Sequence, residues 1–360
     1  MRIIIDAMGG DNAPLEVVLG ACEALAAYPE VELTLVGSEG EIRSVIEQHG
    51  LTPDESRLTI VHTEQVITME DAPLSVIRQK NDSSMSVALR MLAEGKGDAM
   101  ISAGNTGALH AGSSLLVRRI KGIQRSAIAS VLPCASPTLL IDSGANIEVE
   151  PAHMLQFASM GSIYMNKVLG VEKPRVGLLN NGTEPTKGTK KLVEAYGLLS
   201  AQEDINFIGN VEGKQVPYGV CDVLVTDGFT GNVMLKAIEG TASYLIHEIK
   251  GLFYQNALTK LSALPVKKGM KQLKNSFDAS EYGGAPLLGL SKPVIKAHGS
   301  SDARAIKNAV RQAVSFVENE VIVEIVLRTV KPAAPAPQPE PHETEEAQEQ
   351  RQKEGMENVK

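Results

Sequence analysis

The feature that most constrains this chain is an abrupt change from apolar to polar residues within Gly177–Lys191, which reads GLLNNGTEPTKGTKK. The apolar run Arg175–Leu179 has the length of a strand, and a helix-like run resumes at Lys190. Between them lies a loop of glycine, amide and hydroxyl residues with one lysine, Lys187 (the main loop, Asn180–Thr189). In parallel α/β folds such loops follow strands and direct backbone N–H groups toward an anion. The sequence therefore predicts an anion site here, the alternative being an ordinary turn with a solvated lysine.

Other apolar runs of strand length end in loops of the same kind, and each loop leads into a helix-like segment. These runs end at Ile5, Ser102, Val225 and Lys296. Alternating strands and helices imply a mostly parallel sheet, in which we expect every such loop to lie on one edge and to converge on one crevice. We expect this crevice to bind a small anion. Its candidate residues outside the main loop are Asp6, Gly9, Gly10, Asp11, Gly104, Asn105, Thr106, Asp227, Gly228, Asn232, His298, Gly299, Ser300 and Ser301.

Length and composition suit one large folded unit with a tail. The chain has 360 residues, 43% of them hydrophobic, which permits a sizeable core. We expect a layered α/β domain over residues 1–330. From Lys331 onward the sequence is rich in proline and alanine and then in glutamate and glutamine, so residues 331–360 are predicted to be disordered.

Several common functions are disfavoured by what the sequence lacks. A net charge of −8 gives no support to nonspecific nucleic-acid binding. No GxGxxG follows the first strand, and GxxxxGK[ST], GxSxG, HExxH and CxxC do not occur. We therefore predict no dinucleotide, no covalent serine intermediate, no metal and no cofactor. The start MRIIIDAMGG does not resemble a signal peptide, and no apolar run approaches the roughly 20 residues of a membrane span, so a cytoplasmic protein is expected.

Two basic segments are candidates for contacts with partners. The first is VRRIKGIQR, which clusters Arg118, Arg119, Lys121 and Arg125. Such a cluster either forms a solvated face or docks an acidic protein. The second, residues 252–277, is predicted to protrude as two short amphipathic helices separated at Pro265. Its lysine-fringed apolar residues either pack in a hairpin or dimer or touch an anionic membrane. The three that form its apolar tip are Leu258, Leu261 and Leu264.

Seven motifs in this order resemble one bacterial family: DAMGGD, GNTGA, RIKGI, NNGTEPTKGT, DGFTGN, EYGGAPLLG and KAHGSSDA. The chain resembles the phosphate acyltransferases of phospholipid synthesis, which convert acyl-acyl carrier protein and orthophosphate to acyl phosphate. The resemblance spans Met1 to about Val323 and leaves the tail outside. It implies a Rossmann-like αβα fold similar to phosphotransacetylase and to isocitrate and isopropylmalate dehydrogenases. It also implies a homodimer that associates loosely with the inner face of the cell membrane, near the acyltransferase of the next step.

The residues themselves suit this chemistry. Orthophosphate should be largely dianionic near neutrality, as is a phosphate ester with a second pKa of about 6, so its attack needs little help from a base. A thiol with a pKa of roughly 8.5 departs as a thiolate without a strong acid. The protein must instead bind phosphate and offer donors to the developing oxyanion. The expected catalytic residues are Lys187, Asn181 and His298, and the expected binding residues of the main loop are Asn180, Gly182, Thr183, Glu184, Thr186, Gly188 and Thr189.

Several assignments stay open at this point. His298 either protonates the thiolate or makes a structural hydrogen bond, and Ser300 or Ser301 is also a candidate helix N-cap. The aspartates of the crevice are expected to orient donors, because a carboxylate repels phosphate. Two other functions compete with acyl transfer from the carrier protein: a phosphotransacetylase that acts on short acyl-CoA, and a noncatalytic membrane scaffold that binds acyl carrier protein.

Overall fold

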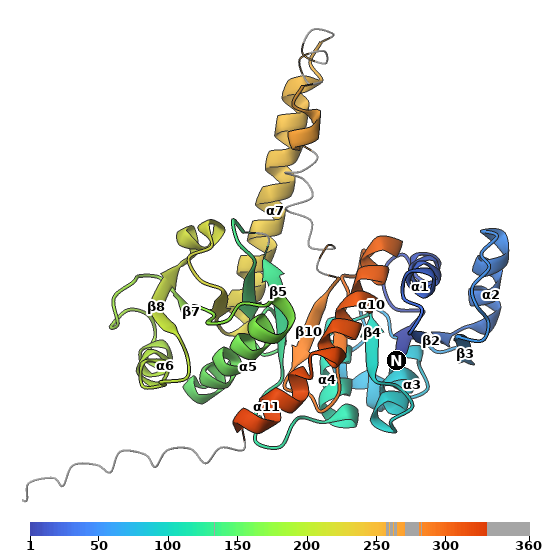
Figure 1. The fold of residues 1–360 in the computed structure, drawn as a ribbon, viewed down its shortest axis with the longest axis horizontal. Helices are drawn as coiled ribbons and strands as arrows, with labels where there is room; N and C mark the ends of the chain where they lie inside the picture. Colours follow the sequence, from blue (N-terminus) through green and yellow to red (C-terminus); the bar gives the residue numbers. More distant parts are fainter. Residues whose placement is uncertain are drawn as a thin grey trace, which may run out of the picture.

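The computed structural model describes residues 1–132, 134–256, 259, 262, 265–270, 281 and 283–329. Strands and helices alternate along most of the chain (Figure 1). The strands are β1 (Arg2–Asp6), β2 (Glu32–Gly37), β3 (Leu58–His62), β4 (Ala99–Ser102), β5 (Ala127–Leu132), β6 (Thr138–Ile141), β7 (Val176–Asn180), β8 (Phe207–Glu212), β9 (Val223–Val225), β10 (Ala285–Leu288) and β11 (Val294–Lys296).

The α-helices connect these strands and cover them. They are α1 (Leu15–Ala27), α2 (Glu39–Gln48), α3 (Ser84–Ala93), α4 (Thr106–Gly112), α5 (Pro151–Leu169), α6 (Lys190–Ser200), α7 (Gly228–Phe253), α10 (Ala303–Glu318) and α11 (Val321–Thr329). Three short helical segments are added: the 3-10 turns η1 (Pro73–Ile77) and η3 (Gly213–Tyr218), and the π-helical η2 (Ser113–Val117).

One sheet of 11 strands runs through the molecule in the order β3-β2-β1-β4-β11-β10-β5-β6-β9-β7-β8. We call β3, β2, β1, β4 and β11 with their helices the first lobe, and β6, β9, β7 and β8 with theirs the second lobe. All strand pairings within each lobe are parallel. The expected mostly parallel α/β sheet is therefore confirmed.

The two lobes are joined by antiparallel strands, which corrects one expectation. β11 pairs antiparallel with β10, β10 with β5, and β5 with β6. Three reversals leave the parallel strands of the two lobes pointing in opposite senses along the sheet. The prediction that every strand-end loop lies on one edge is therefore wrong: each lobe has its own edge of loops.

Each lobe has helices on both faces of its part of the sheet, because consecutive apolar residues of the strands point to opposite faces and both faces need cover. Ile3 and Ile5 of β1 pack in the cluster that contains α1 and α10, whereas Ile4 packs in the cluster that contains α3 and α4. In the second lobe, Leu139 belongs to the cluster with α5 and α6, and its neighbour Leu140 to the cluster with residues of α7. The fold is thus a three-layer αβα arrangement.

Helix α7 extends far beyond the body of the molecule (Figure 1). It begins at Gly228, because Asp227 caps it and accepts from Thr230 N at 2.8 Å. The expected tip residues Leu258, Leu261 and Leu264 and the tail 331–360 lie outside the described residues. Among the residues that the structure does describe, no helix is both long enough and apolar enough to cross a membrane.

Candidate active site

Three strand-end loops of the first lobe interlock, and they contain most of the residues expected there. Asp11 donates its backbone N–H to Gly299 O at 2.7 Å, which joins the loop after β1 to the loop after β11. The loop after β4 is as close, because a Cβ added to Gly9 would lie 2.8 Å from Gly104 N. Gly10 has a φ of +110°, a conformation that favours glycine. The backbone of three loops therefore comes together at one edge.

A buried acid and a buried base lie beneath these loops. The carboxylate of Asp6 accepts hydrogen bonds from Ser102 Oγ at 2.7 Å and Met8 N at 3.3 Å, and burial raises its pKa. Lys296, at the end of β11, donates from Nζ to Ala103 O at 3.1 Å. Burial lowers the pKa of Lys296 to about 8, although the negative charge of Asp6 opposes this shift. Lys296 was not among the candidate site residues expected from the sequence. The signal that could have identified it is a lysine at the end of the apolar run PVIK.

His298 makes contacts with both lobes. Its Nδ1 lies 2.9 Å from Ser300 Oγ, and its Nε2 lies 3.3 Å from Nζ of Lys236 on α7. Ser300 N–H donates to Nδ1 at 3.3 Å, and a protonated lysine at Nε2 can only donate, so each ring nitrogen faces a donor. Burial and then Lys236 lower the pKa of His298. Burial and these contacts therefore disfavour the charged imidazolium.

Other polar residues of the first-lobe loops hold the backbone. Asn105 accepts from Ala108 N at 3.0 Å and so caps α4, while its Nδ2 donates to three carbonyl groups in the segment 68–71. Thr106 is exposed at the start of α4. The N-cap of α10 is Asp302, which accepts from Ala305 N at 2.8 Å. The expectation that Ser300 or Ser301 caps this helix is therefore wrong, because Asp302 occupies the N-cap position itself.

The second lobe builds its loops around Asp142, directly after β6. The carboxylate of Asp142 accepts from four backbone N–H groups, and Nδ2 of Asn146 also donates to it at 2.7 Å. The four donors are Ile128, Gly144, Ala145 and Asn146. Asn146 O accepts from Gly228 N at 2.8 Å, which ties this loop to the first turn of α7. Asn232 is exposed on α7, beside Gly144.

The main loop after β7 folds on itself. Asn180 donates from Nδ2 to Lys187 O at 3.0 Å and accepts from Asn181 N at 2.8 Å, and Thr189 caps α6. Gly182 is buried and Gly188 has a φ of +93°. The other polar side chains of the loop, those of Asn181, Thr183, Glu184, Thr186 and Lys187, are exposed. In the described part of the chain, no hydrogen bond or ion pair joins this loop to the loops of the first lobe. The structure therefore leaves the main loop and the first-lobe loops apart.

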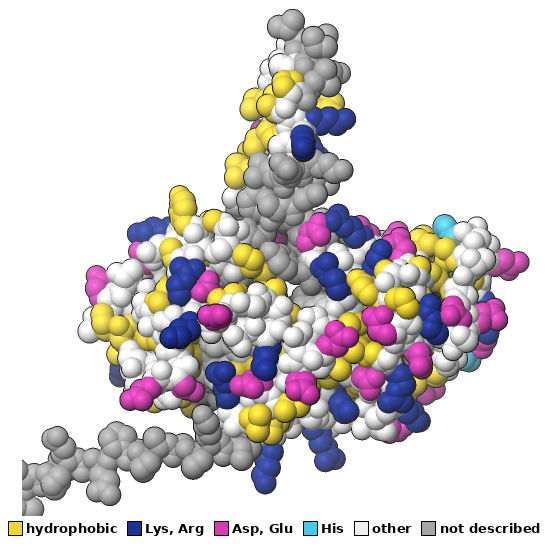
Figure 2. All heavy atoms as spheres, viewed as in Figure 1, with side chains coloured by type: hydrophobic (Ala, Val, Ile, Leu, Met, Phe, Trp, Pro, Cys, Tyr) yellow, Lys and Arg dark blue, Asp and Glu magenta, His cyan; other side chains and the backbone are white. Residues whose placement is uncertain are grey.

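The basic cluster lies on an exposed surface after η2. Arg118, Arg119, Lys121 and Arg125 are all exposed, and none of them pairs with a described carboxylate. Figure 2 shows dark blue side chains along the lower edge of the molecule, where Figure 1 places the segment between α4 and β5. The position of this cluster suits contact with an acidic surface.

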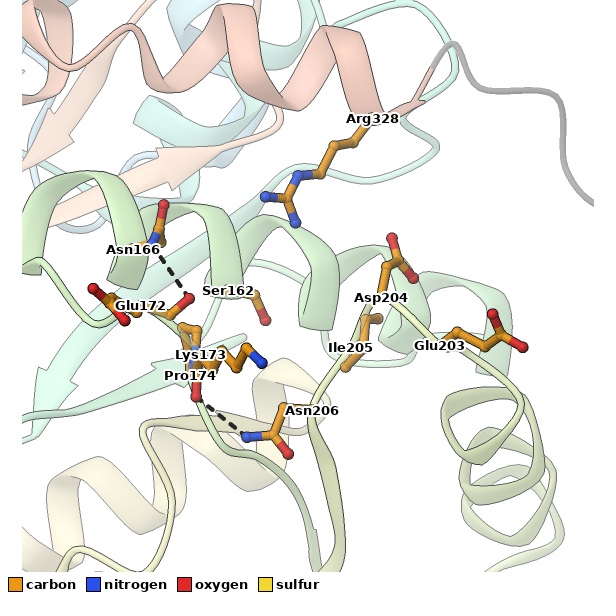
Figure 3. Close-up of a pocket in the computed structure, with 10 residues that line it drawn as sticks. All are labelled: Ser162, Asn166, Glu172, Lys173, Pro174, Glu203, Asp204, Ile205, Asn206 and Arg328. Carbon is orange, nitrogen blue, oxygen red and sulfur yellow. Dashed lines mark hydrogen bonds between the residues drawn. The ribbon is translucent and has the colours of Figure 1, made fainter.

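A cavity of about 490 Å³ lies at the other end of the second lobe (Figure 3). Asn166 of α5 donates to Glu172 O at one wall, and Asn206 donates to Lys173 O at another. Arg328 of α11 completes the lining. These residues surround the amino ends of β7 and β8, whereas the glycine-rich loops follow the carboxyl ends of strands. The cavity shares no residue with the strand-end loops.

The strand-end loops can bind an anion and stabilise developing negative charge. They provide backbone N–H groups, hydroxyl and amide side chains, and three basic groups at the junction of the lobes, Lys236, Lys296 and His298.

Residues 1–324 match the family described as "Fatty acid synthesis protein". Solved structures with the same fold include a phosphotransacetylase from Streptococcus pyogenes, with a TM-score of 0.59 and 18% identity over 90% of this chain and 94% of that one. Another is a phosphotransacetylase from Staphylococcus aureus, with a TM-score of 0.54 and 17% identity over 89% and 93%.

Close sequence relatives carry a single name. A phosphate acyltransferase from Geobacillus sp. is 50% identical over 327 residues, which are 90% of this chain and 97% of the relative. One from Thermoanaerobacter pseudethanolicus is 47% identical over 323 residues, which are 89% and 95% of the two chains. Identity at this level over nearly the whole length establishes the family. This chain belongs to the phosphate acyltransferase family and is an acyltransferase.

Proposed function

We propose that the protein transfers a fatty acyl group reversibly from acyl-acyl carrier protein to orthophosphate and so supplies acyl phosphate for phospholipid synthesis. One observation carries the proposal: glycine-rich loops and basic groups meet at the junction of the two lobes, in a chain about half identical to phosphate acyltransferases. The loops suit a small dianion, and an acyltransferase that uses phosphate needs such a site.

The reaction is direct attack by phosphate. A phosphate oxygen forms a bond to the thioester carbonyl carbon, and the carbonyl oxygen takes up negative charge. Collapse of this adduct breaks the carbon–sulfur bond and releases the carrier thiolate, whose pKa of roughly 8.5 makes it a good leaving group. Donors to the oxyanion are the main catalytic need, since loss of one costs about 100- to 1000-fold in rate.

We propose that the main loop provides donors to this oxyanion. Because no hydrogen bond or ion pair joins the main loop to the first-lobe loops in the described structure, this role requires the two sets of loops to close around the substrates. Lys187 and Asn181 are exposed at its surface, where the thioester of acyl-acyl carrier protein can reach them. The two hydrogen bonds of Asn180 fix the shape of the loop. In this proposal the other candidate residues of the main loop bind phosphate or orient other donors. They are Gly182, Thr183, Glu184, Thr186, Gly188 and Thr189. The contacts of His298 with Ser300 and Lys236, together with its lowered pKa, support the structural role for this residue over proton donation.

The basic cluster is the proposed docking surface for the acidic carrier protein. Its side chains are exposed and unpaired with described carboxylates, so their charges are available. Charge reversal of Arg118, Arg119 and Lys121 should raise the apparent KM for acyl carrier protein and leave the KM for phosphate unchanged. An unchanged KM for the carrier protein would contradict the docking role.

We also propose a homodimer with transient contact to the inner face of the cell membrane and to the next acyltransferase. Phe229 and Tyr244 of α7 are 63% and 62% exposed, which suits burial against a second copy. Figure 2 shows apolar side chains along the protruding helix. Replacing Leu258, Leu261 and Leu264 with glutamate should abolish binding to anionic vesicles while the dimer persists. Equal vesicle binding, or loss of the dimer, would favour a packing role.

The decisive experiment mixes the purified protein with palmitoyl-acyl carrier protein and orthophosphate, and traps acyl phosphate with hydroxylamine. Hydroxamate that forms only with phosphate would support the proposal. The fold shared with phosphotransacetylases makes short acyl-CoA the competing substrate. Product from acyl-CoA but not from the carrier protein would replace our proposal with a phosphotransacetylase activity, and no product from either would favour a noncatalytic scaffold.

A further inference from the structure

Lys236 is a residue of the second lobe that reaches a loop of the first. It lies on α7 four residues after Asn232 and three before Glu239, so all three side chains share one face of the helix. Its Nζ is 2.7 Å from Glu239 Oε2 and 3.3 Å from His298 Nε2. This contact places one face of α7, two turns after its start, against the loop that follows β11. The side chain is 53% exposed, so a solute can approach it.

Lys236 lies among basic and acidic groups that act on one another's pKa values. Its charge lowers the pKa of His298, where it is the largest cause after burial, and it also lowers the pKa of Lys296. Glu239, Asp11 and Asp6 oppose these effects, but Asp6 is buried and its own pKa is raised. Neighbouring basic groups disfavour one another's charged forms, and a dianion that binds between them stabilises those charged forms.

Unpaired backbone donors belong to the loops next to this contact. The N–H groups of Gly9, Gly10 and Gly299 make no hydrogen bond to any described residue. The loops that carry them are in contact, since a Cβ added to Gly10 would lie 3.0 Å from Gly299 O. Close backbone approach with free N–H groups is the usual construction of a phosphate site.

We propose that Lys236 is the cation that binds orthophosphate, which it holds against the first-lobe backbone at Gly9, Gly10 and Gly299. Phosphate then replaces the direct contact between Lys236 and His298 and connects the two lobes. Lys187, the cation expected from the sequence, lies on the exposed main loop with no contact to the first-lobe loops among the described residues. The inference rests on the proposed use of phosphate as acyl acceptor, but its test does not require turnover.

The test measures binding of inorganic phosphate to the full-length protein by isothermal titration calorimetry. Lys236→Gln should raise the Kd for phosphate at least about tenfold, because a charge-assisted hydrogen bond is lost. Lys236→Arg should retain most of the affinity. Lys250→Gln is the matched control: it removes the same charge from the same helix, about 21 Å farther along its axis, and should leave the Kd unchanged.

A second readout follows His298 itself, by NMR titration of its imidazole. Lys236→Gln should raise the pKa of His298, and phosphate should raise it in the wild type but much less in the variant. Unchanged phosphate affinity in Lys236→Gln, or loss of affinity only in Lys187→Gln, overturns the inference. A wild type that binds no phosphate also overturns it. If phosphate binds through Lys236 but no hydroxamate forms, the site stands and the proposed function fails.

Discussion

Asp6 and Asp142 hold equivalent places in the two lobes but are built differently. Each is a fully buried aspartate at the carboxyl end of a buried parallel strand. Asp142 accepts hydrogen bonds from four backbone N–H groups and one side-chain amide, all of which belong to its own loop or to β5 and its neighbourhood. Asp6 accepts from the hydroxyls of Ser102 and Ser84 and from one weak backbone donor, and it lies near the charge of Lys296.

The difference separates a structural carboxylate from an adjustable one. The hydrogen bonds to Asp142 fix its loop, and through Asn146 they fix the start of α7. The carboxylate of Asp142 therefore has a structural role. Asp6 has few donors and a raised pKa, and it shares the base of the crevice with a lysine whose pKa is lowered to about 8. We therefore expect changes at Asp142 to act mainly on folding, and changes at Asp6 and Lys296 to act mainly on protonation in the crevice.

The largest effect is expected from Asp142→Asn. The amide keeps one acceptor oxygen but directs an NH₂ group at buried donors, so several N–H groups lose their partner. At about 1–3 kcal/mol for each unsatisfied group, the free energy of unfolding should fall by about 3–5 kcal/mol. Urea denaturation measures this, with Asp204→Asn as the exposed control that should change by less than about 0.5 kcal/mol. A loss below about 1 kcal/mol would contradict the structural role of Asp142.

Lys296→Met should change the pH dependence of stability. The folded-state pKa of Lys296, about 8, lies below its ordinary value of 10.5, so between these values the unfolded chain holds a proton that the folded chain has released. Stability from this group therefore rises with pH across that window. The unfolding free energy of the wild type relative to Lys296→Met should increase by about 2–3 kcal/mol between pH 7 and 10. Parallel pH profiles would show that Lys296 is not held in this way; Lys250→Met is the matched control.

Asn180→Ala tests whether the conformation of the main loop is held by hydrogen bonds within the loop alone. The buried Asn180 is the central link of the loop, joining Asn181 N and Lys187 O. Its loss should cost about 1–2 kcal/mol and speed amide hydrogen exchange from residue 181 to residue 189. Exchange in the loop after β1 should stay the same, because no hydrogen bond links the two loops in the described structure. Faster exchange in both loops would show a coupling that the static contacts lack; Asn181→Ala is the control within the loop.

Much of this architecture was predictable from local patterns. Apolar runs followed by glycine and polar residues placed β1, β4, β7 and β9 and the loops after them, because a strand, a tight loop and a capped helix leave a local signature. The family motifs then identified the chain, and the comparisons confirm that family. The expected likeness to the two dehydrogenases stays a prediction, as do the roles of the site residues.

What could not be predicted depends on long-range geometry. The two separate edges of loops follow from the antiparallel pairings of β10 and β5, which no periodicity reveals. Lys236 acquires its role only because α7 returns to the loop after β11, 62 residues away in sequence. The motif DGFTGN pointed to the start of α7, but nothing in the sequence distinguished Lys236 from an ordinary surface lysine.

Asp6→Asn should give the smallest effect and completes the comparison. Because the pKa of Asp6 is raised, its neutral form is favoured, and a neutral amide of the same shape imitates that form. The NH₂ of the amide can donate to Ser102 Oγ. We expect a loss of less than about 1 kcal/mol at pH 7, against several for Asp142→Asn. Because the charge of Asp6 raises the pKa of Lys296, the variant should also lower that pKa, so the pH-dependent gain in stability should begin below pH 8. Equal losses for the two asparagine variants would mean that Asp6 is as fixed as Asp142, and that the crevice contains no adjustable pair.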